Sequence, residues 1–270
     1  MTWLDDYVVR ADEPGAARYA GYRPNRIARA ALVEHASDRP WLVCVHGFGM
    51  GSAGLDLRAF RAQHLHRHLG LNLAFPVLPF HGRRNPGGKR SSPAVPGIDV
   101  LDNLHGLAQA VWDVRQLLRL LRERTDQPIG LMGLSLGGAV AATVASVDEP
   151  DAVLLLAPAV DLPALMEDFA TRFNPDEAGA AAALASRSRV VMAPVTPLAL
   201  EPKVPVERRA IFSGTLDLFA KPSSQSVMLW RHWEQPELHW YHGGHVSLFW
   251  SPSARRAIDA TLRRVGLTPG

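Results

Sequence analysis

Residues 133–137, GLSLG, are the most informative part of the sequence about its fold. It matches the pattern G-x-S-x-G, and it stands between an apolar run at 129–133, which predicts a buried strand, and a run of small residues at 137–146, which predicts a helix. In this setting the serine occupies a very tight turn, and the two glycines let the strand and the helix approach each other without Cβ clashes. Ser135 is therefore the candidate nucleophile.

Strand-like and helix-like segments alternate from residue 40 onward, which is typical of βαβ units around a largely parallel sheet. Predicted strands cover residues 41–45, 71–78, 129–133, 152–156, 209–213 and 238–241. Predicted helices cover residues 55–69, 98–124, 137–146 and 253–265. Residues 82–97 are interpreted as a loop, and the first 30 residues show no clear pattern. The fold class is α/β, with a mostly parallel central sheet flanked by helices in a single domain, 1–270.

Residues 161–205 interrupt this alternation. An alanine-rich part at 178–185 is followed by four prolines, at 194, 197, 202 and 205, and no strand pattern is present. The segment predicts a small helical cap inserted between the strands at 152–156 and 209–213. We expect it to cover Ser135 and to shape a substrate pocket.

A glycine-rich turn, HGFGMG at 46–51, follows the predicted strand 41–45. Such a turn frees backbone N–H groups to point at a developing oxyanion, while the tight turn at the serine supplies the N–H of the next residue, Leu136. We expect Phe48 to supply the second N–H, with Gly49 behind it.

Four motifs in this order resemble the α/β-hydrolase superfamily over residues 40–265: HGFG at 46–49, GLSLGG at 133–138, GTLD at 214–217 and GGH at 243–245. The resemblance implies an α/β-hydrolase fold, an acid after a late strand and a histidine after the last strand. Asp217 and His245 match these places, and the order Ser, Asp, His is the one expected for this fold. The resemblance also implies that His46 braces the oxyanion turn and is not a base.

Two of these assignments have competitors. Asp161 follows the strand 152–156, a position that some members of the superfamily use for the acid, although it is also a natural N-cap for a following helix. Asp168 and Glu201 are less well placed. His242 lies close to His245, but the intervening glycines give the later histidine more freedom to reach Ser135.

No metal ion or organic cofactor is expected. His64, His66 and His68 are spaced so that only the first and last share a helical face, and no acidic residue is evident beside them. A surface helix is the favoured interpretation. The one cysteine, Cys44, lies in an apolar run and is interpreted as a core side chain.

The chain of 270 residues has a formal net charge of +3, and its basic residues are spread along it without an aromatic-interleaved stripe, which argues against nucleic-acid binding. The cluster Arg83, Arg84, Lys89 and Arg90 is interpreted as part of a solvated loop, with contact to an anionic substrate beside a pocket as the alternative. No apolar run is long enough to span a membrane, and residues 1–6 lack the pattern of a secretory leader, so a cytoplasmic location is expected.

These observations predict a serine hydrolase that cleaves an ester or thioester of a small to medium, largely apolar acyl group, a small-molecule substrate. The alternatives are cofactor-free haloperoxidase-like chemistry, a C–C bond hydrolase, an acyltransferase or a catalytically silent binding protein of the same fold. Oligomeric state is left open. Apolar side chains near the catalytic edge are the expected substrate contacts: Leu134, Phe80, Phe219 and Phe249, together with Trp250.

Overall fold

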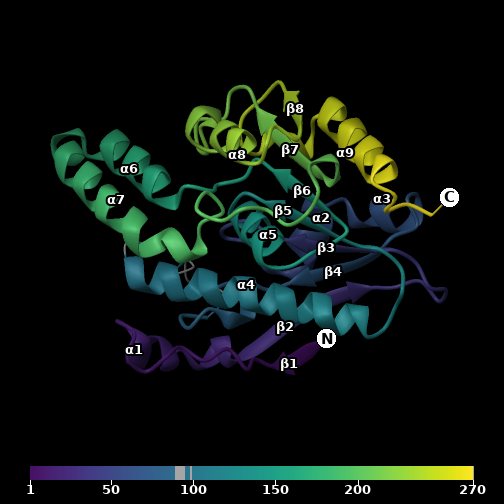
Figure 1. Cartoon of the computed structure of the whole chain (residues 1–270), viewed down its shortest axis with the longest axis horizontal. Helices are drawn as coiled ribbons and strands as arrows, with labels where there is room; N and C mark the ends of the chain where they lie inside the picture. The colour runs from purple at the N-terminus through teal and green to yellow at the C-terminus, as the bar shows by residue number, and fades with distance from the viewer. Residues whose placement is uncertain (89–94, 98, 270) are drawn as a thin grey trace.

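The computed structural model describes residues 1–88, 95–97 and 99–269 (Figure 1). Within these residues eight strands form one sheet in the order β1-β2-β4-β3-β5-β6-β7-β8. The strands are β1 (Thr2–Leu4), β2 (Ile27–Val33), β3 (Trp41–Val45), β4 (Asn72–Pro76), β5 (Ile129–Leu134), β6 (Ala152–Leu156), β7 (Arg209–Gly214) and β8 (Glu237–Tyr241). The strands from β4 to β8 in this order are parallel, and β1 and β2 add an antiparallel edge. This confirms the predicted fold class.

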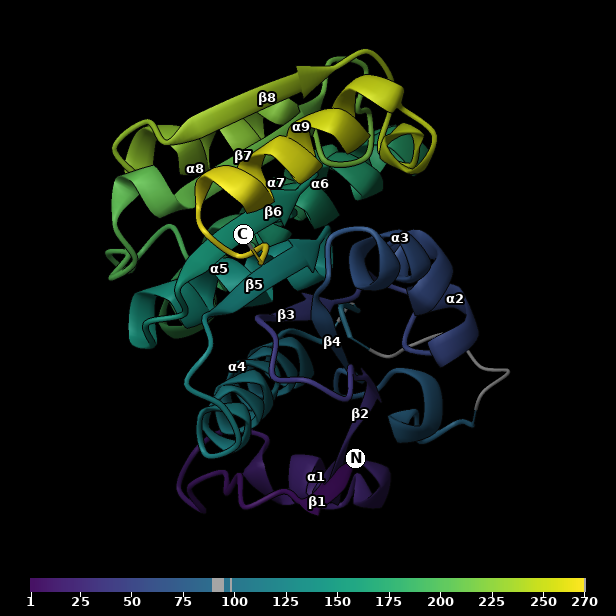
Figure 2. The ribbon, with the colours of Figure 1, turned by 90° about the vertical axis from the view of Figure 1, so that its right-hand side faces the viewer.

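Helices cover both faces of the sheet (Figure 2). On one face α4 (Val100–Arg122), α5 (Leu136–Val147) and α8 (Ser226–His232) contribute to the larger hydrophobic cluster. On the other face α3 (Ala62–Arg67) and α9 (Pro252–Arg264) contribute to a second cluster, with α2 (Ala53–Ala59) at its margin. The central strands β3, β5 and β6 are buried along their whole length, which explains why they read as continuous apolar runs in the sequence.

Several boundaries differ from the sequence-based prediction. The helix expected at 55–69 is two helices, α2 and α3, because Arg61 adopts a left-handed conformation with φ of 54° that no helix interior accepts. The first 30 residues, which gave no pattern, hold β1, a short helix α1 (Ala16–Ala20) and the start of β2. The short helix α8 was also not predicted. Part of the expected loop at 82–97 and residue 98 of the expected helix lie outside the described residues.

The interpretation of Arg84 as a solvated loop residue was wrong, whereas Arg83 is exposed as expected. Arg84 is fully buried, and its guanidinium pairs with Asp113 of α4 and with Asp5 at 3.1 Å. A buried guanidinium requires such partners, because the desolvation of an unpaired charge is very unfavourable. Arg84 therefore ties the N-terminal segment to the sheet. Lys89 and Arg90 lie outside the described residues.

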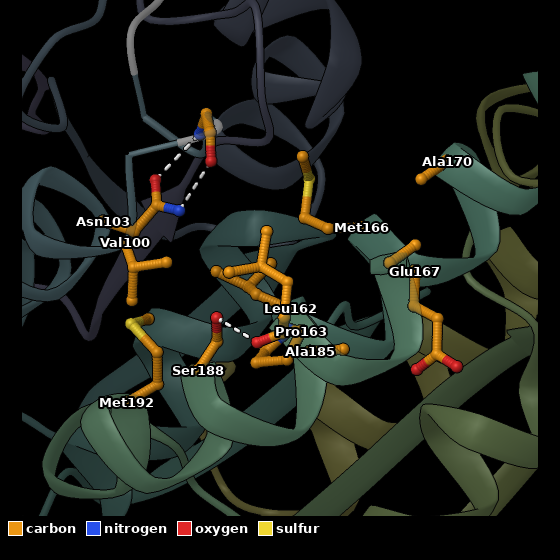
Figure 3. A pocket seen from close by; sticks show the side chains of 13 residues that line it. Val100, Asn103, Leu162, Pro163, Met166, Glu167, Ala170, Ala185, Ser188 and Met192 are labelled. Carbon is orange, nitrogen blue, oxygen red and sulfur yellow. Dashed lines mark hydrogen bonds between the residues drawn. The ribbon is translucent and has the colours of Figure 1, made fainter. Parts of the chain in front are cut away.

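The insertion, residues 161–205, contains α6 (Leu162–Phe173) and α7 (Ala178–Met192), which pack side by side (Figure 1). Together with the first turn of α4 they surround a small apolar pocket of their own (Figure 3). Its lining includes Val100, Leu162, Met166, Ala185 and Met192. The polar groups beside it are already bonded, since the Asn103 side chain bonds to the backbone of Gly97 and Ser188 donates to the Leu184 carbonyl.

Cys44 lies in the middle of β3 and has no exposed surface, which confirms it as a core side chain. Burial raises the pKa of its thiol well above the ordinary value. Among the described residues, no helix combines the length and apolar character that crossing a membrane requires.

Candidate active site

Ser135 stands between β5 and α5 in a strained backbone conformation, with φ of 52° and ψ of −114°. Such an angle is unfavourable for a residue with a Cβ and persists only where the surrounding structure imposes it. Here the surroundings require glycine on both sides: a Cβ on Gly133 would lie 2.2 Å from the Gly137 carbonyl oxygen, and one on Gly137 would lie 2.1 Å from that of Val45. The sequence pattern of the turn thus follows from the close approach of β3, β5 and α5.

The loops after β7 and β8 bring Asp217 and His245 to Ser135. His245 Nε2 lies 2.9 Å from Ser135 Oγ, and His245 Nδ1 lies 2.7 Å from Asp217 Oδ2. Because a carboxylate only accepts hydrogen bonds, Nδ1 carries the proton and Nε2 is free to accept one from the serine hydroxyl. The structure therefore joins the three predicted residues in one hydrogen-bonded chain.

Asp217 is almost fully buried, and its other oxygen, Oδ1, accepts the backbone N–H groups of Phe219 and Ala220 at 2.9 Å each. These bonds fix the orientation of the carboxylate. The two loops are also joined directly, since the Leu216 N–H donates to the Gly243 carbonyl at 3.0 Å. The aspartate and the histidine are thus positioned as one unit.

The turn after β3 lies against the serine. A Cβ on Gly47 would lie 3.4 Å from the Cβ of Ser135, so this turn contacts the nucleophile directly. Within the described part of the chain, the backbone N–H groups of Phe48 and Leu136 have no hydrogen-bond acceptor. Both are available to a negatively charged oxygen next to Ser135, as the sequence predicted, although the role itself stays a prediction.

Two buried histidines brace this turn. His46 Nδ1 donates to the Gly47 carbonyl at 2.8 Å, and its Nε2 accepts the Leu78 N–H at 3.1 Å, which agrees with the bracing role expected for His46. His81 packs edge-on against both His46 and Phe48. Burial lowers the pKa of His46 to about 3 and that of His81 to about 4, so both are neutral at physiological pH.

A pocket opens at Ser135 and has a largely apolar lining. Its walls include Leu134, Phe219 and Phe249, as expected, together with Trp250. Phe80 is not among them. It is fully buried and packs against the rings of Tyr19 and Tyr22, so its expected place in the substrate pocket is corrected. Further lining residues were not predicted, because no sequence pattern links the separate loops and helices that carry them: Met50, Leu55, Arg58, Val246 and Arg255.

The competitors of Asp217 and His245 are engaged elsewhere or remote. Asp161 caps α6 by accepting the Ala164 N–H at 2.9 Å, and Asp168 pairs with Lys221 at 2.6 Å. His242 and Glu201 are exposed. None of residues 161–205 lines the pocket at Ser135, so the expectation that this insertion directly shapes that pocket is corrected.

The histidines of α3 and its C-terminus are not grouped with enough ligands for a metal site. His64 donates from Nε2 to Asp259 of α9 at 2.8 Å, an acidic neighbour that the sequence did not reveal, and His66 stacks on His35. Across the described residues, no three His, Cys, Asp or Glu side chains are arranged to hold a metal ion.

Residues 42–267 match the model of the alpha/beta hydrolase family, which is most of the chain. The chain belongs to the α/β hydrolase family. The order of its Ser, Asp and His residues and the loops that carry them agree with this membership.

A relative of this α/β hydrolase is the uncharacterized protein Rv2627c of Mycobacterium tuberculosis strain H37Rv, which is 44% identical over 262 residues. The match covers 94% of the present chain and 61% of the relative, so the chain spans about three fifths of that relative's length.

Solved structures with the same fold include carboxyl esterase 2 from Tuber melanosporum, at 18% identity and a TM-score of 0.59 over 91% of this chain and 83% of that one. The monoacylglycerol lipase from Paleococcus ferrophilus has 18% identity and a TM-score of 0.52 over 89% of this chain and 99% of its own. At such identities the likeness shows the fold alone.

Proposed function

We propose that this α/β hydrolase is a serine hydrolase that cleaves an ester or thioester of a small to medium, largely apolar acyl group through an acyl-enzyme on Ser135. The observation that carries the proposal is the unbroken chain from Asp217 through His245 to Ser135, with contacts of 2.7 and 2.9 Å. Structural neighbours named as an esterase and a lipase support the choice of an ester.

In the first half-reaction Ser135 Oγ attacks the acyl carbonyl carbon while its proton passes to His245 Nε2. Asp217 holds the other ring nitrogen and stabilises the imidazolium that forms. The carbonyl oxygen becomes an oxyanion and accepts the N–H groups of Phe48 and Leu136, each donor stabilising the transition state by about 3 kcal/mol. The C–O or C–S bond then breaks, and His245 returns the proton to the departing alkoxide or thiolate.

In the second half-reaction a water molecule gives a proton to His245 and attacks the acyl-enzyme. The same N–H groups stabilise the second oxyanion, and the proton on His245 returns to Ser135 as the carboxylic acid leaves. The apolar walls, Leu134, Phe219 and Phe249, are suited to the acyl chain.

A fluorophosphonate probe followed by a series of nitrophenyl esters of increasing chain length tests the proposal. The wild-type protein should become labelled once per chain and lose esterase activity in parallel, whereas Ser135→Ala should be neither labelled nor active toward the esters. Ser146→Ala is the matched control, because Ser146 is a buried serine on α5, the helix that follows Ser135, and its hydroxyl bonds only to backbone carbonyls. Labelling that persists in Ser135→Ala, or no ester turnover by the wild type, would contradict the proposed function.

A further inference from the structure

The pocket at Ser135 continues into a groove on the outer surface of the molecule. Arg58 of α2 and Arg255 of α9 line both the pocket and the groove, so the two spaces share a wall. Beyond them the groove is lined by Arg61 and Arg67 and by three histidines of the same region. Figure 2 shows the α2–α3 region and α9 on the same side of the sheet, and the bonds of Arg61 and His64 to Asp259 join α3 to α9.

The groove carries an excess of positive charge that the protein does not neutralise. Among the described residues, only Arg61 of the four arginines has a carboxylate partner, Asp259 at 3.4 Å, and it shares that carboxylate with His64. Arg58 and Arg67 make no ion pair within these residues, and neither does Arg255. Of the residues that the structure describes, no aspartate or glutamate lines the pocket or the groove.

Arg255 stands at the junction of the two spaces. One guanidinium nitrogen, Nη2, donates to the Phe249 carbonyl, which holds the side chain beside the pocket wall. Its Nε is buried and has no hydrogen-bond partner among the residues that the structure describes. The side chain is held where the pocket and the groove meet, without a carboxylate partner among the described residues.

An apolar pocket that leads into a groove of several unpaired guanidinium groups fits a ligand with two unlike ends. The apolar end belongs beside Ser135, between Phe219 and Phe249, and the anionic end belongs in the groove, which faces solvent. Guanidinium groups bind phosphate through paired hydrogen bonds, and several of them together suit a phosphate with more than one negative charge better than a single carboxylate.

We propose that the substrate is an acyl ester or thioester whose leaving group bears phosphate, with the phosphate held by the groove of Arg58, Arg61, Arg67 and Arg255. The inference rests on the proposed function, because it assigns the two ends of the substrate around the bond that Ser135 attacks. The leaving group lies on the groove side since it must depart to solvent, while the acyl group stays on the serine.

The test compares two thioesters with the same acyl group and the same scissile bond: hexanoyl-coenzyme A, whose thiol bears phosphates, and S-hexanoyl-N-acetylcysteamine, whose thiol is neutral. The value of kcat/KM should be at least about tenfold higher for the coenzyme A thioester at low ionic strength, and the ratio should fall as salt screens the groove. Arg67→Gln should lower this ratio several-fold, mainly through KM of the phosphorylated substrate. Arg119→Gln, on the exposed surface of α4, should leave the ratio unchanged.

A second pair identifies the source of the phosphate. Monohexanoylglycerol 3-phosphate preferred over monohexanoylglycerol, with no preference between the thioesters, would support a phosphorylated oxygen ester of the lipid kind. Equal kcat/KM within both pairs would overturn the inference. A preference for S-adipoyl- over S-hexanoyl-N-acetylcysteamine that Arg67→Gln removes would also overturn it, since the anion would then lie on the acyl group. Failure of the proposed function itself would appear differently, as no turnover of any of these compounds and no labelling of Ser135.

Discussion

The turns that follow β6 and β7 each carry a buried aspartate with the same local arrangement. In both, Oδ1 accepts a backbone N–H two or three residues further on: Phe219 and Ala220 for Asp217, and Ala164 for Asp161. The turns differ at the second oxygen. Oδ2 of Asp217 meets His245 at 2.7 Å.

Oδ2 of Asp161 instead faces Arg189 of α7 at 3.4 Å, an ion pair within the insertion. The two strands are neighbours in the sheet, so either turn begins near the catalytic edge. The difference therefore arises from what the rest of the chain places opposite each carboxylate: the loop after β8 in one case and α7 in the other. A similar aspartate turn serves as a histidine partner in one place and as a helix cap in the next.

The comparison is tested most directly by Asp217→Asn against Asp161→Asn. Asparagine keeps the size of the side chain but cannot stabilise an imidazolium, so Asp217→Asn should lower kcat by about 10⁴, the loss known for the equivalent change in a serine protease. Asp161→Asn should change kcat less than about threefold, because asparagine is also a good N-cap. Ester hydrolysis of both purified variants, with circular dichroism to verify folding, gives the ranking, and the reverse order would move the acid to the turn after β6.

The sequence could predict features set by local backbone geometry, but not those set by contacts between distant segments. The sequence could predict the turn at Ser135 and the loops of Asp217 and His245. Each of them needs a backbone geometry that favours glycine, and those glycines are visible in the sequence. The sequence favoured Asp217 over Asp161, because Asp217 follows its strand through a glycine-containing turn and Asp161 is a natural N-cap, but it could not show what each carboxylate faces. The three-dimensional position of His245 separates them.

Other features depended on contacts between distant segments, and those were missed or wrong. Arg84 was interpreted as solvated because its partners, Asp5 and Asp113, lie 79 and 29 residues away in the chain. Phe80 follows a catalytic-edge strand, yet it turns inward to meet Tyr19 and Tyr22 from a region whose sequence showed no pattern. The cationic groove could not be anticipated, since it combines α2 and α3 with α9.

A second prediction concerns the group that joins the two turns. Gln225, fully buried, accepts the Asp161 N–H at 2.9 Å and donates to the Asp161 carbonyl at 3.1 Å. Gln225→Leu would leave both backbone groups without a partner and should lower the free energy of unfolding by about 3 kcal/mol. Urea unfolding measures this. Ester hydrolysis at low temperature should stay within about threefold of wild type, because the turn after β7 keeps its own bonds.

The control for this variant is Gln127→Leu, whose side chain makes no hydrogen bond within the described residues. It should unfold close to the wild type. A Gln225→Leu variant as stable as this control would show that the turn after β6 does not depend on the link.

A third prediction concerns the two buried histidines that brace the turn after β3, in contrast to the catalytic His245. His46 and His81 have pKa values of about 3 and 4, below the ordinary 6.5, because they are buried neutral, whereas burial raises the pKa of Asp56 to about 6. Between pH 6 and 4 the unfolded chain therefore binds two protons on these histidines and the folded chain binds one on Asp56. Because the unfolded chain binds one proton more, the contribution of these groups to the free energy of unfolding falls on acidification, by about 1.4 kcal/mol per pH unit.

His81→Asn isolates this contribution. It removes one of the two protons that the unfolded chain takes up, so the pH dependence of the unfolding free energy between pH 6 and 4 should become flatter by about 1.4 kcal/mol per unit. Urea unfolding at several pH values measures the slope in both proteins. An unchanged slope would mean that His81 is already protonated in the folded state.

The smallest effect is expected where the insertion reaches the site. The ring of Phe169 in α6 packs edge-on against Phe219, with centroids 4.9 Å apart, and Phe219 in turn lies 4.7 Å from the ring of His245. Phe169→Ala should raise KM for the best nitrophenyl ester by roughly two- to tenfold, the equivalent of one aromatic pair, and leave kcat nearly unchanged. Val190→Ala, an exposed apolar side chain on α7 of the same insertion, is the control and should have no effect on KM. Equal KM values for both variants and the wild type would show that the insertion does not influence substrate binding.

The burial of Cys44 makes the protein well suited to site-directed spectroscopy. With its only thiol inside β3 and largely protonated, the native chain should give almost no background with maleimide reagents. A cysteine placed at Phe173 and a second at Trp250, both of which are strongly exposed, would then carry a pair of spin labels without any need to mutate the core. The interspin distance distribution, recorded with and without a bound phosphonate, would report directly whether the insertion moves relative to the rim of the pocket.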